Sequence, residues 1–247
     1  MARRVPEGPP PPPVVQRLRV HYAKRGRLRF TSHRDFARAF ERALRRAAVP
    51  MAYSAGFSPH PKISYVGAAP TGVASEAEYL EIALARESDP ETIRAALDEA
   101  LPPGLDVVEV LVAGPGSLPQ RIEASHWRVE LPGVSAAAAA TALAAVLARD
   151  TVEVERLTKD GRRSIDVRPA IVLAGVTGDE RAILDLVVRQ VTPSVRPDDV
   201  LAALRIVAGL ALDAPPVAVR VAQGPLDETG TVSDPLAPDR ATVQAKP

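Results

Sequence analysis

The stretch SHRDFARAFERALRR, residues 32–46, carries the strongest local structural signal in the chain. Its apolar residues recur three and four positions apart, which is the spacing of one face of an α-helix. Ser32, followed by Asp35 three positions later, has the pattern of a helix N-cap. We therefore predict a helix from about residue 33 to residue 48, ending before Pro50.

The predicted helix has two faces of opposite character. At 100° per residue, an apolar arc that would pack on a core is formed by Phe36, Phe40, Ala43, Leu44 and Ala47. The opposite arc of about 120° carries five guanidinium groups, those of Arg34, Arg38, Arg42, Arg45 and Arg46. The helix should therefore bury one face and present a basic one.

Upstream of this helix, apolar and basic residues alternate. Residues 17–22 and 27–31 both show a period of two, with a turn at Arg25-Gly26 between them. This pattern predicts a β-hairpin with an apolar inner face, including Leu28 and Phe30, and a basic outer face.

Downstream, strands and helices alternate in two similar halves. In the first half we predict strands at 77–85 and 105–112 and a helix at 90–100 that is capped by Asp89 and has Pro90 in its first turn. In the second half we predict strands at 126–131, 170–174, 182–191 and 217–221, helices at 135–149 and 197–209, and a hairpin at 152–167 that turns at Lys159-Asp160-Gly161. This order predicts an α+β fold of two tandem ferredoxin-like α/β-sandwich halves.

Composition suggests the domain boundaries. Residues 1–15 form a Pro-rich tail that we expect to be disordered, and residues 223–247, with four prolines and no aromatic residue, should be disordered as well. Between the tails we place a basic N-terminal α+β domain at 16–114 and a C-terminal α+β domain at 120–222. The stretch GPGSLP, residues 114–119, is the predicted linker.

The chain has a formal net charge of +1, but its charges are strongly segregated. Residues 17–62 hold twelve Lys and Arg against two acidic residues, whereas residues 76–109 hold ten acidic residues against two Arg. Eight of the nine aromatic residues lie between Tyr22 and Tyr79. Interleaved basic and aromatic residues are typical of nucleic-acid binding. A solvated basic face on a small core, or pairing of the basic block with the acidic one, would give the same pattern.

Several chemistries are excluded by composition. The 247 residues include no cysteine, which excludes disulfides, thiolate zinc sites, cysteine nucleophiles and iron–sulfur clusters held by this chain. The four histidines lack metal-ligand spacing, and no phosphate-binding or dinucleotide motif is present, so we predict neither a metal nor a cofactor. No signal peptide or long apolar segment stands out, so we expect a soluble cytoplasmic protein with no membrane partner.

The most unusual string is YSAGFSPHPKIS, residues 53–64. Prolines on both sides of His60 restrict the backbone, while Tyr53 and Phe57 offer flat aromatic faces. Lys62 and three serines supply hydrogen-bond donors. Such a loop suits a phosphate or a nucleotide, although it could also be a stiff connection with no ligand.

Four runs in the first half resemble the radical-SAM-associated protein family, a domain of unknown function found alone or fused behind a radical-SAM enzyme. The runs are RFTSHRD (29–35), ERALRRA (41–47), AYSAGFSPHPKIS (52–64), and Gly72 with EYL (78–80). The segments DVRP (166–169) and SVRPDDVL (194–201) resemble the family's C-terminal signature, so the resemblance covers about 16–210. It implies a radical-SAM enzyme or ribonuclease E/G as a candidate partner. A chain without cysteine is not itself a radical-SAM enzyme.

From these observations we expect a non-catalytic RNA-binding module that is accessory to RNA modification or processing and takes tRNA or rRNA. The residues predicted to contact RNA are Arg29, His33, Arg34, Arg38, Arg42, Arg45, Arg46, Tyr53, Ser54, Phe57, His60, Lys62, Ser64, Arg168 and Arg196. One alternative is a metal-independent ribonuclease or RNA-modifying subunit that uses His60 with Lys62, His33 and Tyr53. Another is a protein–protein adaptor whose acidic segment, 76–109, docks a basic partner.

Overall fold

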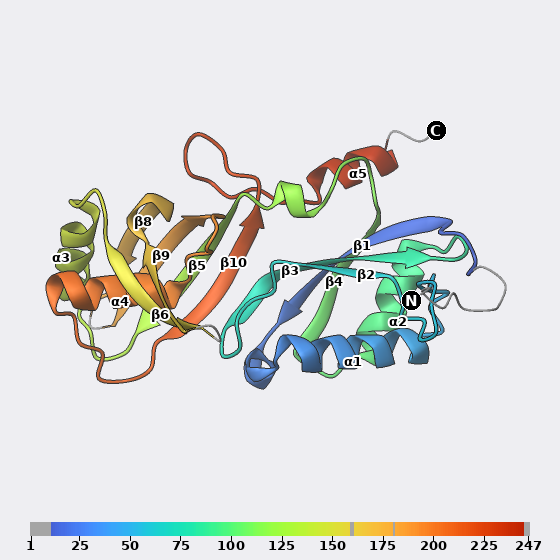
Figure 1. Ribbon diagram of the computed structural model, residues 1–247, viewed down its shortest axis with the longest axis horizontal. Coiled ribbons are helices and arrows are strands. Elements are labelled where there is room, and N and C mark those ends of the chain that lie inside the picture. Colours follow the sequence, from blue (N-terminus) through green and yellow to red (C-terminus); the bar gives the residue numbers. More distant parts are fainter. Residues whose placement is uncertain (1–10, 159–160, 180, 245–247) are drawn as a thin grey trace, which may run out of the picture. The chain divides into compact units, whose positions relative to one another are not determined.

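The computed structural model describes residues 11–158, 161–179 and 181–244, and the chain forms two compact units (Figure 1). Unit 1 is built from residues up to 119 together with residues from 236 onward, and unit 2 from residues 120–235. Of the predicted N-terminal tail, residues 1–10 lie outside the described residues, and residues 11–15 belong to no helix or strand.

Unit 1 is a four-stranded antiparallel sheet with helices on one face. Its strands lie in the order β4-β1-β3-β2, and each neighbouring pair is antiparallel. Helices α1 and α2 cover one face of this sheet (Figure 1). The elements are β1 (Gln16–Lys24), the 3₁₀ helix η1 (Gly26–Phe30), α1 (His33–Arg46), β2 (Ile63–Val66), β3 (Ala74–Leu84), α2 (Pro90–Ala100), β4 (Leu105–Val112) and α5 (Ala237–Gln244).

The core of unit 1 follows from the alternation of β1. Leu18, Val20 and Tyr22 are buried on the helix side of the sheet, where they meet the apolar face of α1. The rings of Tyr22 and Phe36 stack with their centroids 4.5 Å apart, and Phe40 is fully buried beside them. Burying an aromatic or aliphatic side chain of this size contributes about 1.5–3 kcal/mol, so this contact fixes α1 on the sheet.

The local helix signals are confirmed. Ser32 is the N-cap of α1, and its hydroxyl accepts a hydrogen bond of 3.2 Å from the backbone N–H of Asp35. The helix ends at Arg46, two residues earlier than predicted, and the chain turns at Ala48 with φ of 52°. Asp89 caps α2 in the same way, accepting from the N–H of Thr92 at 2.8 Å.

The predicted hairpin at 17–31 is wrong. Residues 26–30 form η1 instead of a second strand, because the chain turns at Gly26 with φ of 55° and continues in a 3₁₀ helix that buries none of its residues. The strands that pair with β1 are β3 and β4, both distant in sequence. The expected basic outer face is also wrong in part, because Arg19 is only 1 % exposed.

The sheet strands of unit 2 are antiparallel and lie in the order β10-β5-β9-β8, with α3 and α4 packed together and against strands of the unit. A two-stranded hairpin, β6-β7, is separate from this sheet; residues 159–160 of its predicted turn lie outside the described residues. The elements are η2 (Pro119–Arg121), β5 (Ala124–Leu131), α3 (Ala136–Leu147), β6 (Glu153–Thr158), β7 (Gly161–Asp166), η3 (Arg168–Ala170), β8 (Ile171–Thr177), β9 (Ala182–Arg189), α4 (Pro197–Ala208) and β10 (Val217–Gly224).

The α+β class is confirmed, but the second predicted tail is not disordered throughout. Within 223–247, β10 extends to Gly224, and α5 packs on unit 1. The reason is a long-range contact: Leu236 and Asp239 are fully buried, and Asp239 pairs with Arg19 at 2.6 Å. A partner 220 residues away leaves no trace in the local composition. Among the described residues, no helix is long and apolar enough to cross a membrane.

Candidate nucleic-acid interface

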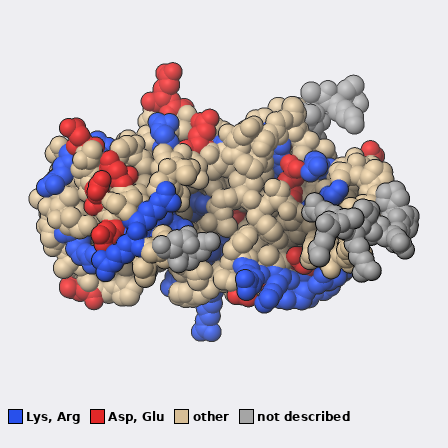
Figure 2. Space-filling view, in the orientation of Figure 1, with Lys and Arg blue, Asp and Glu red and all other residues tan. Residues whose placement is uncertain are grey.

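The five arginines predicted to line one face of α1 are all exposed. Within the part of the chain that the structure describes, none of them forms an ion pair or a side-chain hydrogen bond. Figure 2 shows the result as a continuous run of basic atoms along α1. The helix carries only two acidic residues, and one of these, Asp35, binds Ser32. This face therefore holds a dense, uncompensated positive charge.

The arginines of β1 and of the turn after it are different, because carboxylates lie within reach. Arg17 pairs with Glu81 at 3.0 Å. Arg25 pairs with Glu76 and, at 2.7 Å, with Asp106. The hydrogen bond to Glu76 raises the pKa of Arg25. Carboxylates of the acidic segment 76–109 thus pair with Arg17 and Arg25, whereas the five arginines of α1 have no carboxylate partner among the described residues.

Arg19 is the extreme case. It is buried, and its Nη1 donates to both carboxylate oxygens of Asp239 at 2.6 and 2.9 Å. Its Nη2 donates to the carbonyl oxygens of Gly116 at 2.5 Å and Gly114 at 3.3 Å. A guanidinium held on all sides in this way fastens the 114–116 segment and α5 to the sheet and has no free donor arm for a ligand.

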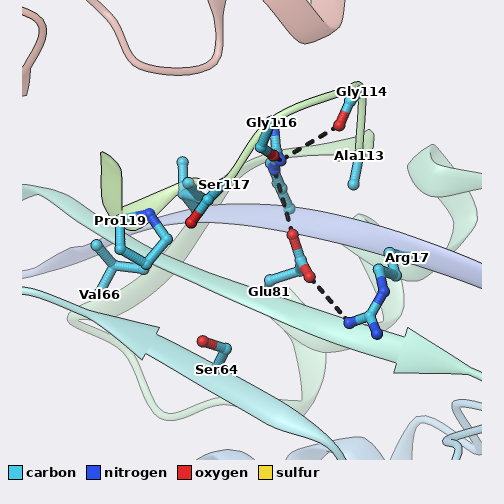
Figure 3. Close-up of a pocket in the computed structure, with 11 residues that line it drawn as sticks. Arg17, Ser64, Val66, Glu81, Ala113, Gly114, Gly116, Ser117 and Pro119 are labelled. Atoms are coloured by element: carbon cyan, nitrogen blue, oxygen red, sulfur yellow. Dashed lines mark hydrogen bonds and ion pairs between the residues drawn. The ribbon is translucent and has the colours of Figure 1, made fainter. Parts of the chain in front are cut away.

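A cavity of about 450 Å³ lies beside this network (Figure 3). Arg17 and Glu81 lie on one side of it, Ser64 and Val66 on another, and residues 113–119 close it. The two arginines that line the cavity are already paired, Arg17 with Glu81 and Arg19 with Asp239. The cavity therefore does not favour an anionic ligand. Ile63 and Tyr65 pack toward the helices, so Ser64 leaves β2 on the opposite face. The structure therefore separates Ser64 from the α1 arginines.

The predicted loop is a closed, ordered turn. Tyr53 and Pro61 form a β-bridge, and the N–H of Ser54 donates to the carbonyl of His60 at 2.9 Å. The N–H of His60 donates in return to the hydroxyl of Ser54 at 3.1 Å. The loop tip turns at Gly56 with φ of 136°, and the neighbouring Phe57 is 72 % exposed. The loop thus holds an aromatic ring out toward solvent from a rigid base.

This loop lies beside the C-terminal half of α1. Tyr53 and Pro61 line a narrow crevice together with Glu41, Leu44 and Arg45 of the helix. Tyr53 keeps 38 % of its surface exposed there, and His60 and Lys62 are exposed as well. The structure therefore places the aromatic loop beside the C-terminal half of α1.

His33 lies at the other end of α1. It is the first residue of the helix, and its ring meets the edge of Tyr65 at 4.9 Å. The hydroxyl of Tyr65 is buried with no hydrogen-bond partner among the described residues, and burial, followed by the charge of Glu41, raises its pKa. Among those residues no hydrogen bond joins the side chains of His33, Tyr53, His60 and Lys62. His33, at the start of α1, therefore lies apart from Tyr53, which lines the crevice beside Arg45 near the other end of the helix.

One feature that the sequence analysis misplaced is Phe30. The alternation of residues 27–31 predicts that Phe30 lies on the inner face of a hairpin, yet it is 59 % exposed, with the guanidinium carbon of Arg29 4.7 Å from its ring centroid. Arg29 itself is half-buried. No local signal distinguishes this ring, because a turn at Gly26 fits a hairpin as well as the 3₁₀ helix, and the strands that pair with β1 are distant in sequence.

The two predicted arginines of unit 2 have local roles. The Nε of Arg168 donates to the carbonyl of Leu147 at 3.2 Å, at the C-terminal end of α3, where a cation is favourable. Arg196 is the exposed N-cap of α4, and its backbone N–H donates to Asp199 at 2.7 Å. Arg168 is thus engaged by backbone carbonyls, while the side chain of Arg196 is exposed.

Comparison with known proteins gives a family and little more. Curated proteins give no match. The crystal structure of an unknown protein from Galdieria sulphuraria is similar over 82 % of this chain and 98 % of that one, at 16 % identity and a TM-score of 0.25. The sequence profile of DUF2344, described as an uncharacterized protein conserved in bacteria, matches residues 17–197, and the chain belongs to this family.

Proposed function

We propose that this chain is a non-catalytic RNA-binding module that holds RNA on unit 1, along α1. The observation that carries the proposal is the contrast in charge compensation: the arginines of β1 are paired with carboxylates, and the five of α1 are not. Arginines without partners on an exposed helix face are suited to neutralise phosphates, because each contact releases condensed counterions. The exposed rings of Tyr53 and Phe57 beside them add faces on which bases can stack.

The test is fluorescence anisotropy of the full chain with labelled tRNA, in EDTA and at several salt concentrations. If the five arginines each contact one phosphate of a single strand, log affinity should fall against log salt with a slope of about −3.5. The double substitution Arg38→Glu with Arg42→Glu should abolish binding without unfolding the protein, because both side chains are exposed.

A matched control is available in unit 2. Arg149 and Arg205 are exposed and have no ion pair within the described residues, so Arg149→Glu with Arg205→Glu changes the net charge by the same amount. We expect this control to bind nearly as well as the unmodified chain. Equal losses in both double variants would mean that net charge, and not the α1 face, governs binding, and would overturn the proposal.

A non-catalytic role also predicts that the RNA stays intact. Labelled tRNA incubated with the chain in EDTA should run unchanged on a denaturing gel. Cleavage that disappears in His60→Ala would contradict this part of the proposal and favour the ribonuclease alternative.

We propose further that the RNA is a tRNA or rRNA and that the module serves a modifying or processing enzyme. The support for a radical-SAM enzyme or ribonuclease E/G as that partner is the sequence resemblance described above. Co-purification of the tagged chain with either enzyme, in RNase-treated and untreated lysates, would test it. If neither enzyme is recovered under either condition, the partner assignment is contradicted.

We also propose that both units are ferredoxin-like. What supports this is the shared order strand-helix-strand-strand-helix-strand, with the first strand between the third and the fourth in each antiparallel sheet. Unit 2 would then carry β6-β7 as an insertion. Backbone NOEs of β5 to both β9 and β10 are expected, and their absence would contradict this assignment.

A further inference from the structure

We propose that unit 1 selects a short single-stranded stretch of RNA, and that Phe30 stacks on an unpaired base at one end of α1 while the 53–57 loop does so at the other. This inference rests on the proposed function, because it specifies what the same surface binds. It adds Phe30 to the interface and predicts a strong preference for unpaired over duplex RNA.

Exposed aromatic rings are confined to one unit of the described chain. In unit 1, Phe30 is 59 % exposed, Tyr53 38 % and Phe57 72 %, whereas Trp127, the sole aromatic residue of unit 2, is buried. A single exposed apolar residue needs no explanation. Three exposed rings on the unit that also carries the unpaired arginines form a pattern that stacking on bases would explain.

The positions of these rings relative to α1 define a track. Phe30 ends η1, just before the helix begins at His33, and Tyr53 shares a crevice with Arg45 near the helix's other end. Figure 1 shows η1 and the loop at opposite ends of α1. The arginine row lies between the two aromatic sites.

The length of this track limits what it can hold. Arg45 lies eleven positions after Arg34, which at 1.5 Å per residue is about 16 Å along the helix axis. An RNA strand of that length has only a few nucleotides, at the low end of the ~4–16 nucleotides that single-strand-binding folds cover. The site should therefore saturate on short oligonucleotides.

Phe30 is held in place before any ligand arrives. The N–H of Thr31 donates to the carbonyl of Leu28 at 2.9 Å, and the N–H of Gly72 donates to the carbonyl of Arg29 at 2.8 Å. The guanidinium of Arg29 stacks on the ring, and more than half of the Phe30 surface remains open. A base on the open surface would complete a stack of guanidinium, ring and base at little entropic cost.

Duplex RNA cannot use these rings. In an A-form helix the base faces are stacked on one another, so aromatic side chains reach only bases that are unpaired. Duplex RNA would still contact the arginines through its phosphates. Stacking should therefore raise the affinity for single-stranded RNA above that for duplex RNA, whereas the arginine charges contribute to the binding of both.

The experiment compares a fluorescein-labelled 12-nucleotide single strand with the 12-base-pair duplex of the same sequence, by anisotropy with the full chain. We expect the single strand to bind at least tenfold more tightly. Phe30→Leu, which keeps the apolar bulk and removes the π face, should weaken single-strand binding on the order of tenfold and leave duplex binding unchanged. Phe30→Trp, which keeps a π face, should retain the single-strand affinity of the unmodified chain.

A matched control and a folding check complete the design. Ile206 of α4 is 59 % exposed, as Phe30 is, and lies in unit 2, so Ile206→Ala should bind both RNAs like the unmodified chain. Circular dichroism should show every variant folded, because both positions are exposed.

The outcomes separate this inference from the proposed function. If the unmodified chain binds single strand and duplex equally, or if Phe30→Leu matches it on single strand, the stacking track is overturned and RNA binding through α1 stands. If the unmodified chain binds neither RNA, both are overturned.

Discussion

The arginines of β1 and those of α1 belong to one basic block in the sequence, yet the fold gives them opposite surroundings. Arg19 of β1 lies directly across from Glu81 of β3 in the strand register, so pairing of the two strands also pairs the charges. Helix α1 packs on the sheet through its apolar face alone, which turns its arginines away from every carboxylate of the sheet. The contrast teaches that the number of basic residues in a segment does not tell how many of them can bind a ligand. The topology of the fold decides which charges are paired and which remain available.

The largest expected effect is on the stability of the protein when the buried Arg19 of β1 is replaced, compared with an exposed arginine of α1. Arg19→Met should lower the free energy of unfolding by about 3–5 kcal/mol, because it leaves the carboxylate of Asp239 buried without its counter-charge. Arg38→Met on α1 should change it by no more than about 0.5 kcal/mol. Urea denaturation measures both. Recovery of stability in Arg19→Met with Asp239→Leu would confirm that the loss comes from the stranded carboxylate, and a similar loss in both single variants would break the contrast.

The second effect concerns the salt dependence of RNA binding. Replacing Arg38 and Arg42 by Ala should make the slope of log affinity against log salt shallower by about 1.4, which is two phosphate contacts of a single strand. Arg17→Ala should leave the slope unchanged, because Arg17 is paired with Glu81. The measurement is anisotropy over a salt series, and a shallower slope for Arg17→Ala would show that β1 also meets RNA.

A third, smaller effect is expected beneath α1, at Tyr65. Its hydroxyl is buried without a partner in the described residues, so Tyr65→Phe should leave the free energy of unfolding unchanged or raise it by about 1 kcal/mol. Because the pKa of Tyr65 is raised in the folded state, its contribution is present below about pH 10 and declines as pH rises above that value. Urea denaturation at pH 8 and pH 10.5 should show a steeper decline in the unmodified chain than in Tyr65→Phe, and equal declines would contradict this account.

The smallest effect is expected at Arg17. Its side chain is half-exposed, so its ion pair with Glu81 is screened by solvent, and Arg17→Ala should cost about 0–1 kcal/mol. A loss as large as that of Arg19→Met would mean that exposure does not separate the two arginines of β1. Thermal unfolding at low and high salt would detect the difference.

Much of unit 1 could be predicted where the signals are local. The cap at Ser32, the bounds of α2 after Asp89 and the exposed arginine face of α1 each depend on residues within a few positions of one another. The rigid loop that carries Phe57 was also predictable, because the prolines around His60 restrict the chain wherever it lies.

The features that could not be predicted depend on distant partners. Phe30 continues the alternation of a strand, yet a strand needs a neighbour, and β1 finds its neighbours in β3 and β4. Arg19 looks like any surface arginine until Asp239 arrives from the far end of the chain. Ser64 belongs by its sequence to the loop predicted to contact RNA, but the pleat of β2 turns it to the face of the sheet opposite the helices.

The pairing of Arg19 with Asp239 also fixes an order of assembly during translation. All of unit 2, residues 120–235, lies between the two segments that complete unit 1, so it is synthesised before α5. Domains usually fold from the N-terminus as the chain emerges. Here Arg19 lacks its Asp239 partner until the last segment of unit 1 has been synthesised, when every residue of unit 2 is already part of the chain.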